Sequence, residues 1–105
     1  MPTTHDGASH DRARTEKIAQ TTQRWIDANC DVGHWHESTS SALFTSWDRW
    51  RRAQPNGTLP LRCNRTLAGL VRQLGTMGYE RVRVGRHRGL AGLCVRPDAP
   101  VAHGA

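Results

Sequence analysis

The stretch that decides the fold is Leu43-Phe44-Thr45-Ser46-Trp47-Asp48-Arg49-Trp50. Leu43, Trp47 and Trp50 recur at the spacing of a single helical face, and Phe44 lies beside them. The intervening residues are polar or charged. The pattern predicts an amphipathic helix whose aromatic side chains pack in a core.

Residues on both sides set the limits of this helix. Ser38 to Ser41 offer hydroxyl groups that can cap its first turn, and the turn-forming sequence Pro55-Asn56-Gly57 follows it. We therefore expect a helix from this cap to about Ala53. Upstream, the segment 34–37 alternates as an edge strand would. Trp35 within it is expected to be packed or partly buried, with stacking on a base as the alternative.

Two further helices are predicted, one on each side. Between about Arg14 and Cys30, apolar residues fall on one helical face. After Pro60-Leu61, Asn64 or Thr66 can cap a helix that runs to Gly75 or Gly78. Its apolar side comprises Leu67, Leu70, Val71 and Leu74, and its opposite side comprises Arg65, Gly69, Arg72, Gln73 and Thr76.

The remaining ordered segment has the pattern of a β-hairpin. Val82 and Val84 alternate with Arg81 and Arg83, which predicts buried valines and outward arginines. A loop at 86–89 and a second alternating run to Val95 follow. The fold class expected is therefore α+β, a winged helix-turn-helix with three helices, a short edge strand and a C-terminal hairpin wing. We expect this domain to span 14–96, with disordered tails at 1–13 and 97–105.

Charge is distributed unevenly along the 105 residues. Residues 1–48 carry 4 basic and 7 acidic side chains, whereas residues 49–105 carry 11 basic and 2 acidic ones. All cations except Lys17 are arginine, whose guanidinium group suits phosphates and guanine edges, although a GC-rich genome produces the same bias. The basic half is the expected contact surface for nucleic acid.

The third helix and the hairpin together form the predicted DNA interface. Arginine and glutamine side chains on the helix can bond base edges in a major groove, while Gly69 lets the backbone approach closely. Cations on the wing can neutralise phosphates. The alternative is that these charges only solvate a surface and protect an edge strand. The expected DNA-binding residues are Arg62, Arg65, Arg72, Gln73, Thr76, Arg81, Arg83, Arg86, His87 and Arg88.

Other chemistries have weaker sequence signals. Cys30, His34 and His36 could join Cys63 or Cys94 in a zinc site, but no Cys-x-x-Cys pair is present. Cys63 lies between Arg62 and Arg65 near a predicted helix start, where the pKa of a thiol can fall, but the sequence shows no base that could activate it. A buried or semi-buried thiol is the expected state of Cys63. No phosphate-binding glycine loop occurs. We expect no enzyme activity, no cofactor and no structural metal.

The pattern from Ile18 to Arg96 resembles the C-terminal winged-helix domain of phage, plasmid and poxvirus-type primase-helicase replication proteins. The resemblance rests on the aromatic helix, on Pro60-Leu61 before the next helix, on a basic hairpin from Arg81 to Val95, and on a helix ending that comprises Leu70, Leu74, Gly78 and Tyr79. Leu70 stands where the family prefers Phe, and the primase and helicase parts are absent.

The resemblance implies a DNA-binding module of a mobile genetic element, a replication accessory or a transcription regulator. Its expected partner is nucleic acid, double-stranded DNA in the first instance, with a replication or host defence protein as a further partner. The alternative is a phage- or plasmid-encoded protein that inhibits a host nucleic-acid-processing or defence complex. The lack of a long apolar run or a signal peptide predicts no membrane association and a cytoplasmic location.

Overall fold

A computed structural model describes residues 2–55, 59 and 63–96 of the chain, with side chains from residue 12 onward. Three helices and a three-stranded antiparallel sheet follow in the order α1 (Pro2–Asn29), β1 (Cys30–Thr39), α2 (Ser40–Ala53), α3 (Leu67–Thr76), β2 (Glu80–Val84) and β3 (His87–Val95). The sheet order is β1-β3-β2. The predicted α+β class and the order of its elements are confirmed.

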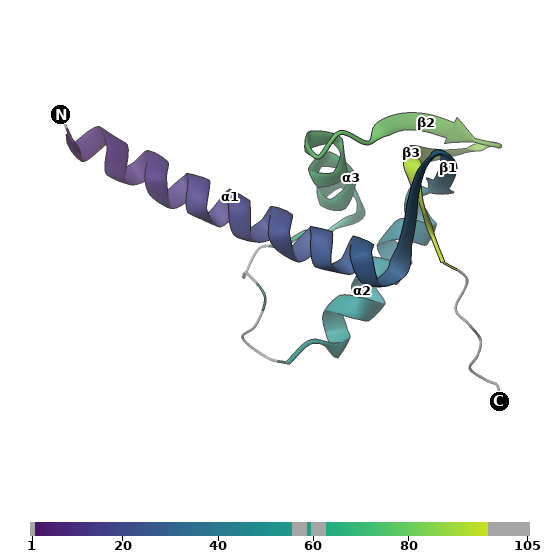
Figure 1. Cartoon of the computed structure of the whole chain (residues 1–105), viewed down its shortest axis with the longest axis horizontal. Helices are drawn as coiled ribbons and strands as arrows, with labels where there is room; N and C mark the ends of the chain where they lie inside the picture. The colour runs from purple at the N-terminus through teal and green to yellow at the C-terminus, as the bar shows by residue number, and fades with distance from the viewer. Residues whose placement is uncertain (1, 56–58, 60–62, 97–105) are drawn as a thin grey trace.

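Helix α1 is longer than the sequence indicated. It begins at Pro2 rather than near Arg14, so the segment predicted as a disordered tail is helical. Figure 1 shows this amino-terminal part running well beyond the other elements, which gather around the carboxyl end of the helix. Once the packed part has formed, each added residue extends an existing helix and needs no new nucleation. The second predicted tail, 97–105, and the turn at 56–57 lie outside the described residues.

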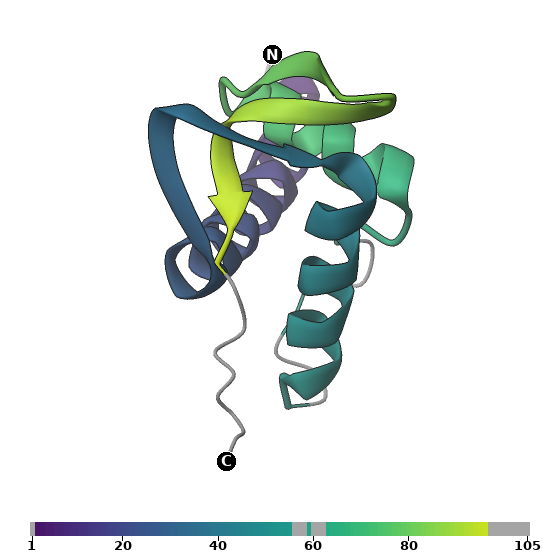
Figure 2. The ribbon, with the colours of Figure 1, turned by 90° about the vertical axis from the view of Figure 1, so that its right-hand side faces the viewer.

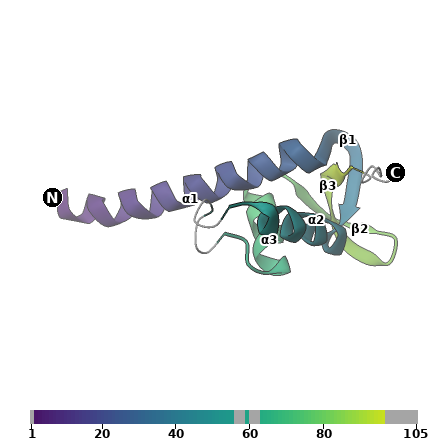
Figure 3. The same ribbon diagram turned by 90° about the horizontal axis from the view of Figure 1, so that it is seen from below.

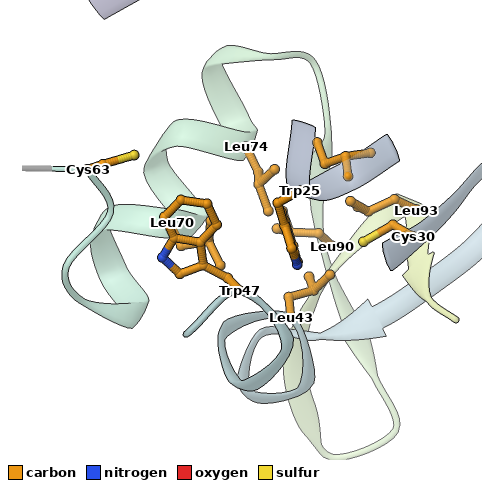
Figure 4. Close-up of a cluster of buried hydrophobic side chains, with 10 residues drawn as sticks. Trp25, Cys30, Leu43, Trp47, Cys63, Leu70, Leu74, Leu90 and Leu93 are labelled. Atoms are coloured by element: carbon orange, nitrogen blue, oxygen red, sulfur yellow. The ribbon is translucent and has the colours of Figure 1, made fainter. Parts of the chain in front are cut away.

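The aromatic stretch forms the centre of the core, as predicted. Trp25, Leu43 and Trp47 are fully buried, and Trp50 packs partly buried against them. The rings of Trp25 and Trp47 meet edge to face, with centroids 5.9 Å apart. Figure 4 shows that α3 contributes Leu70 and Leu74 to the same cluster and β3 contributes Leu90 and Leu93. The core thus joins all three helices to the sheet.

Hydroxyl caps begin both helices that follow the first strand. The side chain of Thr39 accepts a hydrogen bond from the Ala42 backbone N–H at 3.1 Å. Thr66 accepts the corresponding bond from Gly69 at 3.0 Å. These bonds satisfy N–H groups that have no partner within the helix, which fixes where each helix starts. The predicted caps, Ser38–Ser41 for α2 and Asn64 or Thr66 for α3, include the observed ones.

Strand β1 is an edge strand, as predicted, but it extends on both sides of 34–37. Its pairing with β3 is interrupted between Val32 and Glu37, so residues 33–36 lie opposite Gly92 alone. Gly92 has φ +102°, a backbone conformation that favours glycine, and a Cβ there would lie 3.0 Å from the Tyr79 ring. The bulge turns Trp35 outward, and its side chain is 80% exposed. The prediction that Trp35 packs inward is wrong.

The hairpin turn is also tighter than expected. Only Gly85 and Arg86 separate β2 from β3, and residues 87–89, predicted as loop, belong to the strand. Figure 2 shows the hairpin passing above the start of α2, and Figure 3 shows α3 beside α2 on the same side of α1. No helix in the described part of the chain contains a stretch long and apolar enough to cross a bilayer.

The two tryptophans at positions 47 and 35 provide a matched test of this core. Trp47→Ala should lower the free energy of unfolding by roughly 3–5 kcal/mol, because the substitution leaves a cavity at a fully buried site. Trp35→Ala should change it by less than about 0.5 kcal/mol, since that ring lies in solvent. Urea unfolding followed by circular dichroism measures both. Equal losses in the two variants would contradict the assigned packing.

Candidate nucleic-acid interface

The polar face of α3 lies opposite its buried leucines, as its sequence pattern predicted. Arg65 precedes the helix, and Arg72 and Thr76 follow along it; all three side chains are exposed, while Gln73 is half-buried. These four residues line a hollow of about 410 Å³ that Ile18 of α1 closes on one side. Helix α1 therefore runs beside the face predicted to read bases.

Gly69 lies against the cap of α3, a contact that the sequence did not predict. A Cβ at this position would lie 3.2 Å from Oγ1 of Thr66, the hydroxyl that caps α3. The absence of a side chain therefore makes room for the helix cap. Close approach of a ligand backbone is not needed to explain this glycine.

The hairpin brings a second set of cations to the same region. The side chains of Arg81, Arg83, Arg86, His87 and Arg88 are all exposed. The remaining predicted contact residue, Arg62, lies outside the described residues. The structure thus brings together α3 and the hairpin, two elements that are separate in the sequence.

The arginines of β2 lie on a different face of the sheet from the one predicted. Arg81 is directly opposite Leu90 on β3, and Arg83 is directly opposite Arg88. Directly opposite residues of an antiparallel pair share one face. Since Leu90 is fully buried in the core, the arginines extend from the core face and do not point away from it.

The valines that alternate with these arginines are less buried than the sequence pattern predicted. Val82 and Val84 are only half-buried, and neither belongs to the partly buried side chains that pack against the core. The expected alternation in exposure is present, with exposed arginines and half-buried valines, but the valines are not the side chains that join the core. The cause is the register with β3, which the strand's own alternation does not determine.

A groove of about 860 Å³ separates the hairpin from α3. Its walls carry Arg72 from the helix and Arg81, Arg83 and Arg88 from the hairpin. Within the described part of the chain, ion pairs join Asp48 to Arg51 and Arg52, and Asp31 to Arg96. None of these pairs includes a groove arginine. The groove therefore concentrates positive charge that no neighbouring carboxylate balances.

Arg96, which the sequence analysis did not single out, has a structural role. Its guanidinium group donates to the backbone oxygens of Asp27, Ala28 and Cys30 and to the Asp31 carboxylate at 2.9–3.1 Å. The carbonyls of Asp27 and Ala28 lie in the last turn of α1, where a cation is favourable to the helix dipole, and that of Cys30 begins β1. The side chain therefore joins the end of β3 to α1. Sequence offers no local signal for this contact, because the partners are more than 60 positions apart.

The zinc site weighed as an alternative would need Cys30, His34 and His36 to converge, and these side chains lie apart. Cys30 is buried in the core while His34 is exposed, and His36 instead places Nδ1 at 3.4 Å from Sγ of Cys94. Among the described residues, no group of three or more histidine, cysteine and acidic side chains is positioned to hold a metal ion. The bulge in β1 separates residues that a regular strand would have kept on one face.

Cys30 and Cys63 do not have the lowered pKa that a nucleophilic thiol would need. Burial raises the pKa of Cys63 to about 11, against a smaller lowering by Arg51. Burial likewise raises the pKa of Cys30 to about 12, with a further contribution from Cys94. Both thiols stay protonated at neutral pH, which is the unreactive form. Cys63 is therefore the buried thiol that was expected, and Arg51 lowers its pKa by less than burial raises it.

No protein-family model, curated protein or solved structure matches the chain.

Thiol labelling of the native protein tests the placement of the cysteines. At pH 8, a disulfide reagent should modify Cys94 first, because it is only partly buried, and should reach Cys30 and Cys63 only after unfolding. Absorbance of the released thiolate gives the number and rate of reacting groups. Cys94→Ser should remove the early phase. Rapid labelling of Cys63 in the native protein would contradict its burial.

Proposed function

We propose that this chain is a DNA-binding protein with a winged helix-turn-helix fold. The order of its elements and the sheet order β1-β3-β2 support this fold, with α3 as the recognition helix and the β2–β3 hairpin as the wing. In the proposed complex, α3 enters a major groove of double-stranded DNA and the wing contacts phosphates. The protein acts by binding and needs neither catalysis nor a cofactor.

The observation that carries the proposal is the convergence of unbalanced cations from two elements. Arg65 and Arg72 from the α3 region and Arg81, Arg83, Arg86 and Arg88 from the hairpin are exposed on neighbouring surfaces. Arg83 and Arg88 are directly opposite on adjacent strands, an arrangement that costs free energy unless an anion lies between them. A phosphate backbone supplies anions at regular intervals.

The resemblance to primase-helicase winged-helix domains supports a role in a mobile genetic element. We propose a replication accessory or a transcription regulator, acting on DNA in the cytoplasm. The order of aromatic helix, polar-faced helix and basic hairpin is the part of that resemblance that bears on binding.

A second candidate is a protein that binds and inhibits a host nucleic-acid-processing or defence complex. The exposed apolar side chains of β1 favour it, because Val32 is 60% exposed and Trp35 is 80% exposed. Large exposed aromatic side chains are enriched in protein–protein interfaces. A gel shift with duplex DNA at increasing salt separates the two candidates, and absence of binding at low salt would overturn the first.

The contribution of the wing can be measured from the salt dependence of binding. With about five phosphate contacts, log affinity should fall against log salt with a slope of about −4 to −5. Arg86→Ala combined with Arg88→Ala should reduce the magnitude of this slope by about two. With two fewer phosphate contacts, binding releases fewer counterions from the DNA. Fluorescence anisotropy on a duplex gives the slope.

The control for this experiment removes the same charge elsewhere. Arg24 and Arg52 are exposed, one over the Trp50 ring and the other paired with Asp48. Substituting both with Ala should leave the slope close to that of the wild type. An unchanged slope in the Arg86 and Arg88 variant would remove the wing from the interface.

Base reading by α3 is tested at Arg72, an exposed residue on the helix. Arg72→Ala should weaken binding to a preferred sequence by about 1–3 kcal/mol and reduce discrimination among sequences, because a bidentate contact to guanine is lost. Selection of bound sequences from a random pool, before and after the substitution, provides the comparison. Uniform weakening on all sequences would assign Arg72 to phosphate contact.

A further inference from the structure

The groove between α3 and the hairpin has a cationic part and an apolar part. The arginines make up the cationic part, whereas Leu67, Ala68 and Val71 contribute apolar surface from α3. Leu67 is 39% exposed, one of the large hydrophobic side chains that the described structure leaves accessible. The volume of about 860 Å³ falls within the range of small-ligand sites, roughly 300–1,000 Å³.

The cationic wall is a continuation of the core face. Arg81 pairs with the buried Leu90, and the next directly opposite pair on this face is Arg83 with Arg88. A third element could have covered the face if these positions were apolar. Arginines there keep the groove open and attract an anion.

Phosphates alone do not account for the apolar side of the groove. A duplex presents phosphates and sugars to the protein and keeps the planar faces of its bases stacked inside. An unpaired nucleotide presents a base face together with its phosphate. Bases that leave the stack are bound on guanidinium planes and on aromatic or apolar side chains. The groove provides guanidinium groups beside an apolar surface.

We propose that this groove binds an unpaired nucleotide of a DNA strand, with its base against Leu67 and Val71 and its phosphate among Arg81, Arg83 and Arg88. The inference rests on the proposed DNA binding and specifies the DNA: the chain prefers a duplex that ends in a single-stranded overhang. The duplex contacts α3 and the wing tip, and the overhang enters the groove between them.

The experiment compares two DNAs by fluorescence anisotropy at equal salt, a short blunt duplex and the same duplex with a short overhang. The wild type should bind the overhang DNA about tenfold more tightly, the effect of one stacked base. Equal affinity for the two DNAs would overturn the groove proposal and leave duplex binding in place. Failure of both DNAs to bind at low salt would overturn the proposed function itself.

A matched pair of variants locates the preference in the groove. Ala68 is exposed and lines the groove, whereas Ala53 is exposed at the end of α2 and lines a separate hollow. Ala68→Glu places a carboxylate among the groove arginines, and Ala53→Glu changes the net charge equally. The first should reduce the overhang preference to less than about twofold, and the second should retain it. Retention of the preference in both variants would overturn the proposal.

Two further results complete the test. Binding of overhang DNA and single strands without binding of blunt duplex would support the groove proposal and overturn the assignment of duplex DNA as the ligand. Displacement of labelled overhang DNA by a mononucleotide, at the same nucleotide concentration as by a single strand, would identify a free nucleotide as the ligand. That result would overturn the proposal that the groove receives a DNA strand.

Discussion

The arrangement of the three helices depends on Asn64, a buried residue just before α3. Its side-chain amide donates to Oγ1 of Thr22 on α1 at 2.9 Å, and its backbone oxygen accepts from Nε1 of Trp47 on α2 at 2.9 Å. Its φ of 43° lies in the left-handed region, which asparagine tolerates better than most residues. One residue therefore fixes the start of α3 relative to both other helices.

The position of α3 in turn determines the groove. The helix buries Leu70 and Leu74 in the core, and its N-terminal residues face the hairpin across the open space. The hairpin is held by β3, which lies between the two other strands. Because both sides of the groove are attached to the same core, a loss of core packing would change the distance between the two sets of arginines. Stability and ligand binding are coupled through this geometry.

Sequence periodicity predicted the elements whose faces are determined locally. The aromatic repeat located α2, and the leucine repeat together with Thr66 located α3 to within a few residues. Features that depend on pairing between distant segments were not predictable in this way. The register of β2 against β3 turned Arg81 and Arg83 to the core face, and the bulge opposite Gly92 exposed Trp35. The early start of α1 follows from helix propagation and leaves no apolar repeat to detect.

The bulge in β1 also determines how this edge of the sheet can meet another protein. An edge strand usually presents a continuous row of free N–H and C=O groups that a partner strand can extend. In β1, residues 33–36 depart from the regular pairing with β3, so the strand has no uniform backbone repeat along its length. A partner at this edge would have to recognise side chains, Trp35 and Val32 above all, because strand addition lacks a regular template. The exposed tryptophan is thus displayed without making this edge of the sheet a template for strand addition.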